Sequence, residues 1–253
     1  MRSIPKVISA LDSVTANSLA AITKLYSPVF DQLVPVSSPE VAEMTKLYEN
    51  CQRMVCIAYA NEMADACDGL GIDPYEVTAA ARTKPFGFAP FFPGLGVGGH
   101  CIPVNPFYLL SNCAFPLLEH ATATMWERPR RIAQRALDRL RARAAVDGSG
   151  AAVRKPRVLV AGLGFKRGQS NLSNSPGVEL VKTLSVSREV DVMWADALVP
   201  QESFAQVAKL PDSEWTAEGL GAFDVVIVSF RQVGMDMGVL DGIVGTEVEM
   251  WCP

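Results

Sequence analysis

Residues 37–69 form a long helical pattern, SSPEVAEMTKLYENCQRMVCIAYANEMADACDG. Ser37 or Ser38 can cap this helix, and Pro39 suits its first position because a proline there loses no helical hydrogen bond. Gly69 is a typical helix end. The apolar residues between these signals recur at helical spacing, at Val41, Met44, Leu47, Tyr48, Cys51, Met54, Val55, Ala58, Met63 and Cys67. The stretch therefore predicts one long helix on which a helical domain is built.

A second, shorter helix is predicted directly after this one. Asp73 and Glu76 have the spacing of a capping box, and Pro74 occupies the first turn. The pattern continues to about Arg82, where a glycine-rich loop begins.

Residues 105–143 predict two more helices, interrupted near Pro116 and Pro129 because proline breaks the helical hydrogen-bond ladder. The second half of this segment is rich in arginine, at positions 128, 130, 131, 135, 139, 141 and 143. Such a run is typical of a solvated helix face. A contact with a phosphate or with an acidic neighbour is the alternative interpretation.

The pattern changes beyond residues 144–156, a segment of small and polar residues that predicts a domain linker. Three short apolar runs predict strands, at residues 157–161, 190–194 and 224–228. A glycine turn at 162–164 and a helix at 175–184 connect the first two. Strands that alternate with helices imply a small parallel sheet of Rossmann type. The predicted fold class is α/β, with an all-helical central domain followed by this sheet domain.

Composition and charge narrow the range of functions. The 253 residues carry a net charge of −4 and have a pI near 5.3, which argues against general nucleic-acid binding. The sequence shows no signal peptide and no membrane span, and its six cysteines lack metal-like spacing. Two histidines, His100 and His120, are too few for a histidine-rich metal site. We expect a cytoplasmic protein with reduced cysteines, no metal and no membrane partner.

The most distinctive stretch is residues 84–110, KPFGFAPFFPGLGVGGHCIPVNPFYLL. Its glycines at 94, 96, 98 and 99 allow the backbone to approach a ligand closely. Pro103 and Pro106 stiffen the chain after Cys101. A thiol presented in this way suits nucleophilic attack on a bound sugar or acyl group. A turn-rich connector with a buried cysteine is the plainer interpretation of the same spacing.

This stretch resembles the active-site loop of the UDP-glucose/GDP-mannose dehydrogenase family. The segment GGHCIPV at residues 98–104 is most similar to the branch of UDP-N-acetylhexosamine 6-dehydrogenases. The segment AEMTKLYEN at residues 42–50 resembles a second signature of the same family. The resemblance implies NAD-dependent oxidation of the C6 alcohol of a nucleotide sugar to a carboxylate, through a thiohemiacetal and then a thioester on the cysteine.

The resemblance also implies roles for individual residues. Cys101 matches the nucleophile, Lys46 matches a lysine that stabilises the developing oxyanion, and Asn50 matches an asparagine that helps to hold a water. Lys46 and Asn50 are four residues apart and therefore share a helix face. The expected substrate-binding residues are Phe92, Gly94 and Gly96 in the loop, and Phe165 and Lys166 in a GLGFK segment that resembles the family's GLAFK.

The chain departs from the family pattern at two places. Asn105 stands where the family has an aspartate that assists hydrolysis, and an amide cannot take a proton from water. We therefore expect either slow hydrolysis or a purely orienting role at this position. Residues 171–174, Asn-Leu-Ser-Asn, replace a run of Asp, Arg and Glu that helps to hold domains and subunits together in the family.

Residues 1–35 precede the long helix and contain no strand–glycine-loop–helix unit. Ile4-Pro5-Lys6-Val7 resembles the end of the family's first domain, which binds NAD. The expected layout is a remnant of that domain at 1–35, the helical central domain at 36–143, a linker at 144–156, and a UDP-sugar-binding domain at 157–253 that is truncated at its C-terminus. A separate NAD-binding chain would then complete the cofactor site.

Two functions are compatible with these residues. The first is a nucleotide-sugar 6-dehydrogenase that is impaired as an isolated chain. The second is a non-catalytic module for nucleotide-sugar binding or for dimerisation. Because the long helix pairs two subunits in the family, the resemblance also implies a homodimer through residues 39–68.

Overall fold

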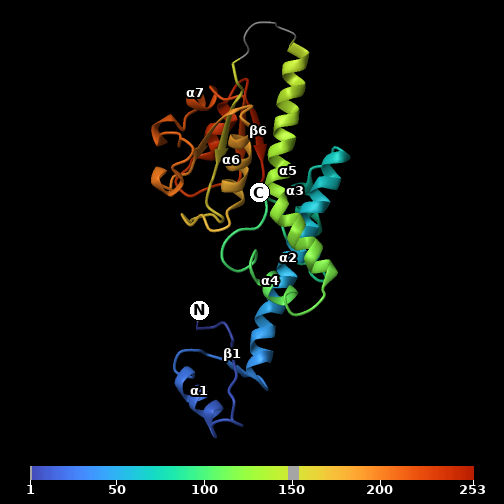
Figure 1. Ribbon diagram of the computed structural model, residues 1–253, viewed down its shortest axis with the longest axis vertical. Helices are drawn as coiled ribbons and strands as arrows, with labels where there is room; N and C mark the ends of the chain where they lie inside the picture. The colour runs from blue at the N-terminus through green and yellow to red at the C-terminus, as the bar shows by residue number, and fades with distance from the viewer. Residues whose placement is uncertain (1, 148–153) are drawn as a thin grey trace. The chain divides into compact units, whose positions relative to one another are not determined.

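The computed structural model describes residues 2–147 and 154–253. The chain folds as two compact units, residues 1–52 and 53–253. Figure 1 shows the helices and strands of each unit coloured in chain order. Part of the predicted linker, residues 148–153, lies outside the described residues.

The first unit contains a strand–helix–strand motif that the sequence patterns do not predict. β1 (Lys6–Ile8) and β2 (Leu33–Pro35) pair in parallel, and α1 (Ser18–Tyr26) connects them. Each strand has three residues, which is too short for the alternation that identifies a strand in a sequence. The connection from β1 to α1 contains no glycine, so it lacks the loop that dinucleotide-binding folds place before their first helix.

The long predicted helix is confirmed as α2, which runs from Pro39 to Gly69. The Ser38 hydroxyl accepts a hydrogen bond from the Val41 amide at 3.4 Å, as expected of a residue that caps the first turn. The helix stops just before Gly71, whose φ of 69° lies in the left-handed region that favours glycine. The boundary between the two compact units falls within α2, after residue 52.

α3 (Pro74–Ala81) confirms the second predicted helix. The Asp73 carboxylate accepts a hydrogen bond from the Tyr75 amide at 2.8 Å, which is the predicted N-cap. The Tyr75 hydroxyl donates to the carbonyl of Met250 at 3.4 Å. Burial raises the pKa of the Tyr75 hydroxyl above its ordinary value, so this side chain remains a neutral donor.

The prediction of a helix break near Pro129 is wrong. α4 (Asn105–Leu110) is short, but α5 (Pro116–Asp147) continues through Pro129. The proline removes the amide that would bond the Met125 carbonyl, at a cost of about 3 kcal/mol. Packing offsets this cost, because fully burying one aliphatic side chain contributes roughly 1.5–3 kcal/mol. The buried residues of α5 beyond the proline are Ile132, Ala133, Ala136, Leu137 and Leu140.

The C-terminal part of the chain forms an all-parallel sheet in the order β4-β3-β5-β6. The three predicted strands are confirmed as β3 (Arg157–Ala161), β4 (Asp191–Ala195) and β5 (Val225–Val228). β6 (Glu247–Met250) is an additional strand that the patterns do not predict. Its glutamates interrupt the apolar run, as is tolerated at the edge of a sheet.

The crossover from β3 to β4 is α6 (Pro176–Ser187). Ser175 caps this helix, because its hydroxyl accepts a hydrogen bond from the Val178 amide at 3.2 Å. Pro176 follows at the first helical position, as the sequence predicts.

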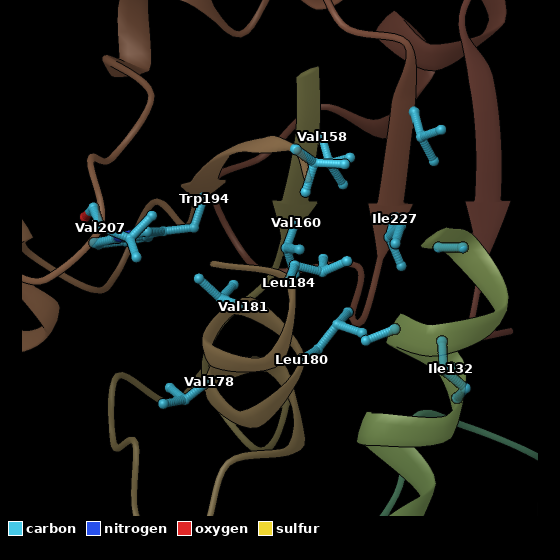
Figure 2. Packing of buried hydrophobic residues seen from close by; sticks show 14 of the residues in the cluster. Ile132, Val158, Val160, Val178, Leu180, Val181, Leu184, Trp194, Val207 and Ile227 are labelled. Atoms are coloured by element: carbon cyan, nitrogen blue, oxygen red, sulfur yellow. The ribbon is translucent and has the colours of Figure 1, made fainter. Parts of the chain in front are cut away.

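α6 and α5 cover one face of the sheet together. Figure 2 shows Leu180 and Leu184 of α6 beside Val160 and Ile227 of the sheet, with Ile132 of α5 in the same cluster. α5 therefore belongs to the core of the sheet, although the sequence assigns it to the helical part of the chain. It also extends four residues into the predicted linker at 144–156, since it ends at residue 147.

Short helical turns contribute to the opposite face. α7 (Ala217–Leu220) and η3 (Met237–Gly242) supply side chains to a second cluster around β3 and β5, and η2 (Asp212–Glu214) precedes Trp215 of the same cluster. η1 (Gln201–Phe204) packs on the first face instead, through Phe204. A parallel sheet covered on both faces is typical of α/β domains.

Within residues 2–147 and 154–253, no helix combines the length and the apolar character that crossing a membrane requires. The same residues contain no group of three or more side chains that could hold a metal ion.

Candidate active site

Cys101 lies in an exposed turn between the glycine-rich loop and α4. Its carbonyl accepts hydrogen bonds from the amides of Val104 at 3.1 Å and Asn105 at 2.8 Å. The turn therefore leads directly into Asn105, the half-buried first residue of α4. The thiol is exposed and forms no disulfide, which contradicts the interpretation of Cys101 as a buried structural cysteine.

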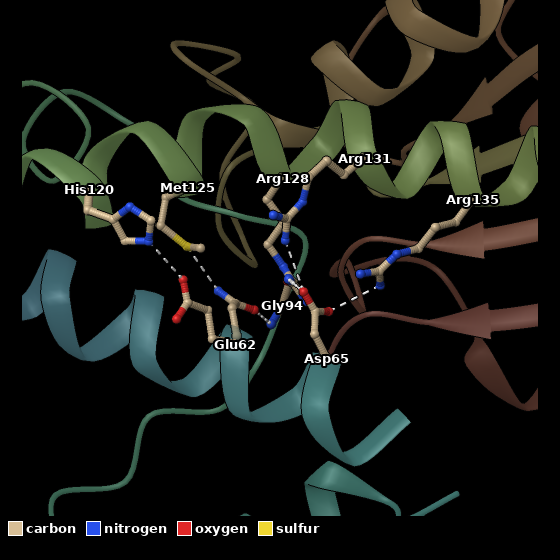
Figure 3. Close-up of polar contacts among 9 residues, drawn as sticks. Glu62, Asp65, Gly94, His120, Met125, Arg128, Arg131 and Arg135 are labelled. Atoms are coloured by element: carbon tan, nitrogen blue, oxygen red, sulfur yellow. Dashed lines mark hydrogen bonds and ion pairs between the residues drawn. The ribbon is translucent and has the colours of Figure 1, made fainter. Parts of the chain in front are cut away.

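The start of the loop is fixed at Gly94 by two helices. The Gly94 amide donates to Oδ1 of Asn61 on α2 at 2.8 Å, and its carbonyl accepts from Nε of Arg128 on α5 at 2.9 Å. Both helical side chains are almost fully buried, with exposed fractions of 0% and 1%. Figure 3 shows Gly94 between the two helices. Both polar groups of this residue are satisfied, so its orientation is strongly restricted.

Arg128 is held in turn by Asp65 of α2. Its Nη1 lies 3.0 Å from Asp65 Oδ2, and Arg131 and Arg135 donate to the same carboxylate at 3.0 and 3.1 Å (Figure 3). Burial alone would raise the pKa of Asp65, but hydrogen bonds from Arg135 and Arg128 outweigh it and leave the pKa below its ordinary value. One carboxylate thus neutralises a buried guanidinium and binds α2 to α5.

Apart from Arg128, the arginine run of α5 lies on a solvent-accessible face, and its side chains also contact acidic neighbours. Every arginine of the run pairs with a carboxylate. The partners on other elements are Asp65, Glu179, Glu189, Glu247 and Glu249. The alternative interpretation, a contact with acidic neighbours, is therefore confirmed. Apart from Arg128 the arginine side chains are 38–54% exposed, so each of these pairs contributes less than about 1 kcal/mol.

Gly96 packs the middle of the loop against α5. A Cβ on this residue would lie 3.4 Å from the Met125 carbonyl oxygen and 3.5 Å from the Pro129 ring. Because Pro129 has no amide hydrogen, the Met125 carbonyl has no hydrogen-bond donor within the helix. The backbone of Gly96 lies next to this carbonyl. The contacts of Gly94 and Gly96 are with the protein itself, so their predicted role in substrate binding stays a prediction.

Phe165 lies against the part of the loop that precedes Cys101. A Cβ on Gly98 would lie 2.5 Å from the Cβ of Phe165, and one on Gly99 would lie 2.9 Å from its ring. Gly99 also has a φ of 90°, which favours glycine. The structure thus places Phe165, from the turn after β3, beside the cysteine loop. Lys166 follows it and is exposed.

The same part of the loop contacts the segment before α6. The Gly99 amide donates to the Ser173 carbonyl at 2.8 Å, and the Asn174 side chain donates to the Gly99 carbonyl at 2.9 Å. Asn171 Nδ2 lies 3.1 Å from Nε2 of His100. The residues that replace the family's charged run therefore touch the two residues before Cys101.

Phe92 lies at the other end of the loop. It is half-buried, and the guanidinium of Arg82 lies 5.9 Å from the centre of its ring. This distance is compatible with a cation–π contact. A role of Phe92 in substrate binding stays a prediction.

Lys46 and Asn50 belong to the first compact unit. Lys46 is exposed, and its Nζ pairs with Glu49 Oε2 at 2.9 Å on the same helix. Asn50 has an exposed fraction of 3%. A buried amide on the same helix as an exposed ammonium is compatible with the roles that the family implies, and their placement next to Cys101 stays a prediction.

A buried carboxylate organises the turn after β3. Asp196 has an exposed fraction of 1% and accepts hydrogen bonds from the amides of Leu163 at 2.8 Å and Gly164 at 3.2 Å. The Gln232 side chain donates to it as well, at 3.2 Å. In dinucleotide-binding folds the amides of this turn bind a phosphate. Here the amides of the turn donate to the Asp196 carboxylate instead, so the turn does not fit the phosphates of a dinucleotide.

Sequence reasoning missed the residues that hold Gly94. A signal was present, because Arg128 lies three residues after Met125 and four before Ile132, on the apolar stripe of α5. Asn61 likewise follows the buried Ala58 by three residues on α2. A polar residue on an apolar stripe indicates a buried hydrogen-bond partner.

Together these features define a class of protein: a helical region that presents an exposed thiol on a glycine loop, fixed on a parallel α/β sheet. Residues 40–132 match the central domain of the UDP-glucose/GDP-mannose dehydrogenase family. The UDP-N-acetyl-D-glucosamine 6-dehydrogenase of Pseudomonas aeruginosa is 35% identical over 205 residues, which cover 75% of this chain and 46% of that protein. The enzyme of the same name from Salmonella typhi is 30% identical over 246 residues, 90% of this chain and 55% of that protein.

The solved structure of a UDP-D-ManNAc dehydrogenase from Pyrococcus horikoshii has the same fold, with a TM-score of 0.77. It is 24% identical, and the alignment covers 98% of this chain and 60% of that one. The chain belongs to the UDP-glucose/GDP-mannose dehydrogenase family. It spans about half the length of the two curated relatives.

Proposed function

We propose that this chain supplies the substrate site and the nucleophile of an NAD-dependent nucleotide-sugar 6-dehydrogenase. The proposed substrate is a UDP-N-acetylhexosamine or a UDP-hexose. One observation carries the proposal: an exposed thiol, Cys101, on a loop that is fixed at Gly94 and at Gly99 in a chain of this family. The two curated relatives named above are UDP-N-acetyl-D-glucosamine 6-dehydrogenases, which supports the same substrate class here.

Cys101 would act by covalent catalysis. Its thiolate sulfur would attack the C6 aldehyde, so that a C–S bond forms while the carbonyl electrons move to oxygen. The ammonium of Lys46 would stabilise the resulting oxyanion. Once C6 is oxidised to a thioester, water would attack it, the C–S bond would break, and the carboxylate and the thiolate would be released.

Two strand–helix turns of the described residues do not fit the phosphates of NAD. The connection from β1 to α1 has no glycine, and the turn after β3 gives its amides to Asp196. We therefore assign the cofactor to another domain or to a separate NAD-binding chain, and assign only the substrate side of the reaction to the residues described here.

The alternative function is a non-catalytic nucleotide-sugar-binding or dimerisation module. Asn105 favours this alternative, because its amide cannot act as the general base for thioester hydrolysis. General-base assistance contributes roughly 10²–10⁴-fold to such a step. The substitution Asn105→Asp should therefore raise the rate of product release in an active preparation by up to that factor, and should have no effect on a pure binding module.

The test combines the purified chain with UDP-N-acetylglucosamine, NAD and a candidate NAD-binding partner, and follows NADH absorbance and the carboxylate product. We expect NADH and the carboxylate product from the wild type, and no carboxylate product from Cys101→Ser, because only the second oxidation passes through the thioester. Cys113→Ser is the matched control, because Cys113 is also exposed and free but lies outside the glycine loop. Carboxylate formation that survives in Cys101→Ser refutes the thioester chemistry. UDP-sugar binding by calorimetry with no NADH formation supports the alternative.

We also propose a homodimer through α2 and a cytoplasmic location. In the first unit α2 exposes Val41, Met44 and Tyr48, and the Tyr48 side chain is 72% exposed. Exposed apolar side chains that share a helix face are typical of a surface that a partner covers.

A further inference from the structure

We propose that residues 171–174, here named the asparagine latch, are a positioning element that fixes the Gly99 peptide and thereby the direction of the Cys101 thiol. The inference rests on the proposed function only for the chemical role of that thiol. The contacts of the latch stand independently of it.

The loop needs such an element because its own residues do not determine its path. Gly98 and Gly99 precede His100 and Cys101, and two consecutive glycines have more accessible backbone conformations than any other pair of residues. Phe165 excludes side chains at both glycines, but packing alone leaves the rotation of the peptide groups open. Hydrogen bonds from outside the loop must therefore select one conformation.

The latch provides these bonds at Gly99. The Gly99 amide donates to the carbonyl of Ser173 at 2.8 Å, and the Gly99 carbonyl accepts from Nδ2 of Asn174 at 2.9 Å. One donor and one acceptor on the same residue fix the orientation of the backbone two residues before Cys101. Gly99 itself is buried, so a loss of either bond would leave a buried polar group without its partner.

A second contact reaches the residue next to the thiol. Asn171 Oδ1 accepts a hydrogen bond from the Ser173 amide at 2.8 Å, which fixes the direction of its side-chain amide. Its Nδ2 therefore faces Nε2 of His100, at 3.1 Å. Since Nδ2 is a donor, it can donate a hydrogen bond to Nε2 of His100 when that nitrogen carries no proton.

The latch is itself rigid because it is anchored at the start of α6. Ser175 follows it directly, is 5% exposed, and donates to the Leu163 carbonyl at 2.5 Å. The same hydroxyl caps α6 through the Val178 amide. Asn174 adopts the left-handed conformation, with a φ of 50°, which asparagine tolerates better than most residues. The sheet domain thus holds the cysteine loop through a fixed turn.

The test uses two substitutions that keep this backbone conformation. Asn174→Gly removes the donor and tolerates positive φ. Asn174→Asp keeps the shape but turns a carboxylate oxygen toward the Gly99 carbonyl. Asn17 provides the matched controls Asn17→Gly and Asn17→Asp, because it is also left-handed, with a φ of 64°, and its side chain makes no capping bond.

Two measurements on the full chain report whether the asparagine latch holds the loop. Hydrogen–deuterium exchange reports the Gly99 amide, and peptide-resolved alkylation by iodoacetamide compares Cys101 with the exposed Cys113 in the same sample. One hydrogen bond contributes about 0.5–1.5 kcal/mol, which corresponds to roughly a twofold to tenfold change. We expect both Asn174 variants to accelerate exchange at Gly99 and alkylation of Cys101 within this range or above it, with Cys113 unchanged and the thermal midpoint lowered by no more than roughly a few degrees. The Asn17 variants should match the wild type.

Unchanged exchange at Gly99 in both Asn174 variants overturns the latch. Equal acceleration at Cys101 and Cys113 overturns it as well, because a general loss of structure would then explain the result. These outcomes are separable from failure of the proposed function. A wild-type chain that forms no NADH with a competent partner refutes that function, while the exchange at Gly99 still tests the latch.

Discussion

The substitution Asp65→Asn tests the physical basis of the loop anchor. It removes the negative charge that faces three arginines at 3.0–3.1 Å but keeps the size of the side chain. Arg128 is decisive among them, because its side chain is 1% exposed whereas those of Arg131 and Arg135 are 44% and 38% exposed. Breaking a buried ion pair by removing one partner costs about 3–5 kcal/mol. The two exposed pairs add less than about 1 kcal/mol each.

We therefore expect Asp65→Asn to lower the free energy of unfolding by about 3 kcal/mol, at the low end of this range because the Asp65 side chain is 19% exposed. Urea denaturation followed by tryptophan fluorescence measures this loss. All four tryptophans lie after residue 52, so the signal reports the second unit. Asp138→Asn is the matched control on α5, because its pair with Arg141 is exposed on both sides and should cost less than about 1 kcal/mol.

The double substitution Asp65→Asn with Arg128→Met separates charge burial from simple loss of contacts. If the cost arises from an uncompensated buried cation, removing the cation as well should restore part of the stability. The restoration should be incomplete, because the Gly94 carbonyl then loses its donor. Additive losses in the double variant, or a loss below 1 kcal/mol in Asp65→Asn alone, would refute this account.

Acid should reduce the difference between the wild type and Asp65→Asn. The pKa of Asp65 in the folded chain lies below its ordinary value of 3.8. A carboxyl with a lowered pKa stabilises the fold fully above its unfolded pKa, and this contribution disappears as the pH falls through the folded pKa. The gap in unfolding free energy should therefore be constant at neutral pH and should narrow below about pH 4.

Two further substitutions test the packing of the loop and the proposed dimer. Gly99→Ala should destabilise the loop by roughly 1–3 kcal/mol, because the residue has a φ of 90° and a Cβ would lie 2.9 Å from the Phe165 ring; proteolysis at the loop that is no faster than in the wild type would contradict this. Tyr48→Glu should convert the proposed dimer to a monomer in light scattering at micromolar concentration, because it places a charge on the exposed face of α2; a wild-type chain that is already monomeric would contradict the dimer.

Local signals predicted most helices and strands of this fold. The caps at Asp73 and Ser175 lie next to the helices they cap, so a short window of sequence contains the whole signal. Pro129 was misleading, because its local effect is unfavourable and the packing that overrides it comes from distant strands. The strands β1 and β2 escaped prediction because three residues carry no periodic pattern.

The sequence predicted the chemical groups of the candidate site, but not the residues that hold the cysteine loop in place. Cys101 and its glycines form one contiguous motif, which a sequence displays directly. The residues that fix this motif come from elsewhere in the chain, since Arg128 pairs with a carboxylate 63 positions away and Asn174 donates to a residue 75 positions away. No local signature identifies either partner, and the arginine run suggested contact with solvent alone because its acidic partners are dispersed along the sequence.

Because α5 and the sheet share one hydrophobic core, the helical part of this chain cannot be separated from the sheet domain without exposing that core. α5 contributes Arg128 to the loop anchor and Ile132 to the sheet core, so one helix connects both supports of the cysteine loop. A fragment that ends with α5 would expose the apolar stripe that the sheet covers, and it would lose Phe165 and the asparagine latch. Of the contacts described above, only those at Gly94 would then hold the loop that carries the Cys101 thiol. We infer that the helical part and the sheet must fold together before Cys101 can be directed at a substrate.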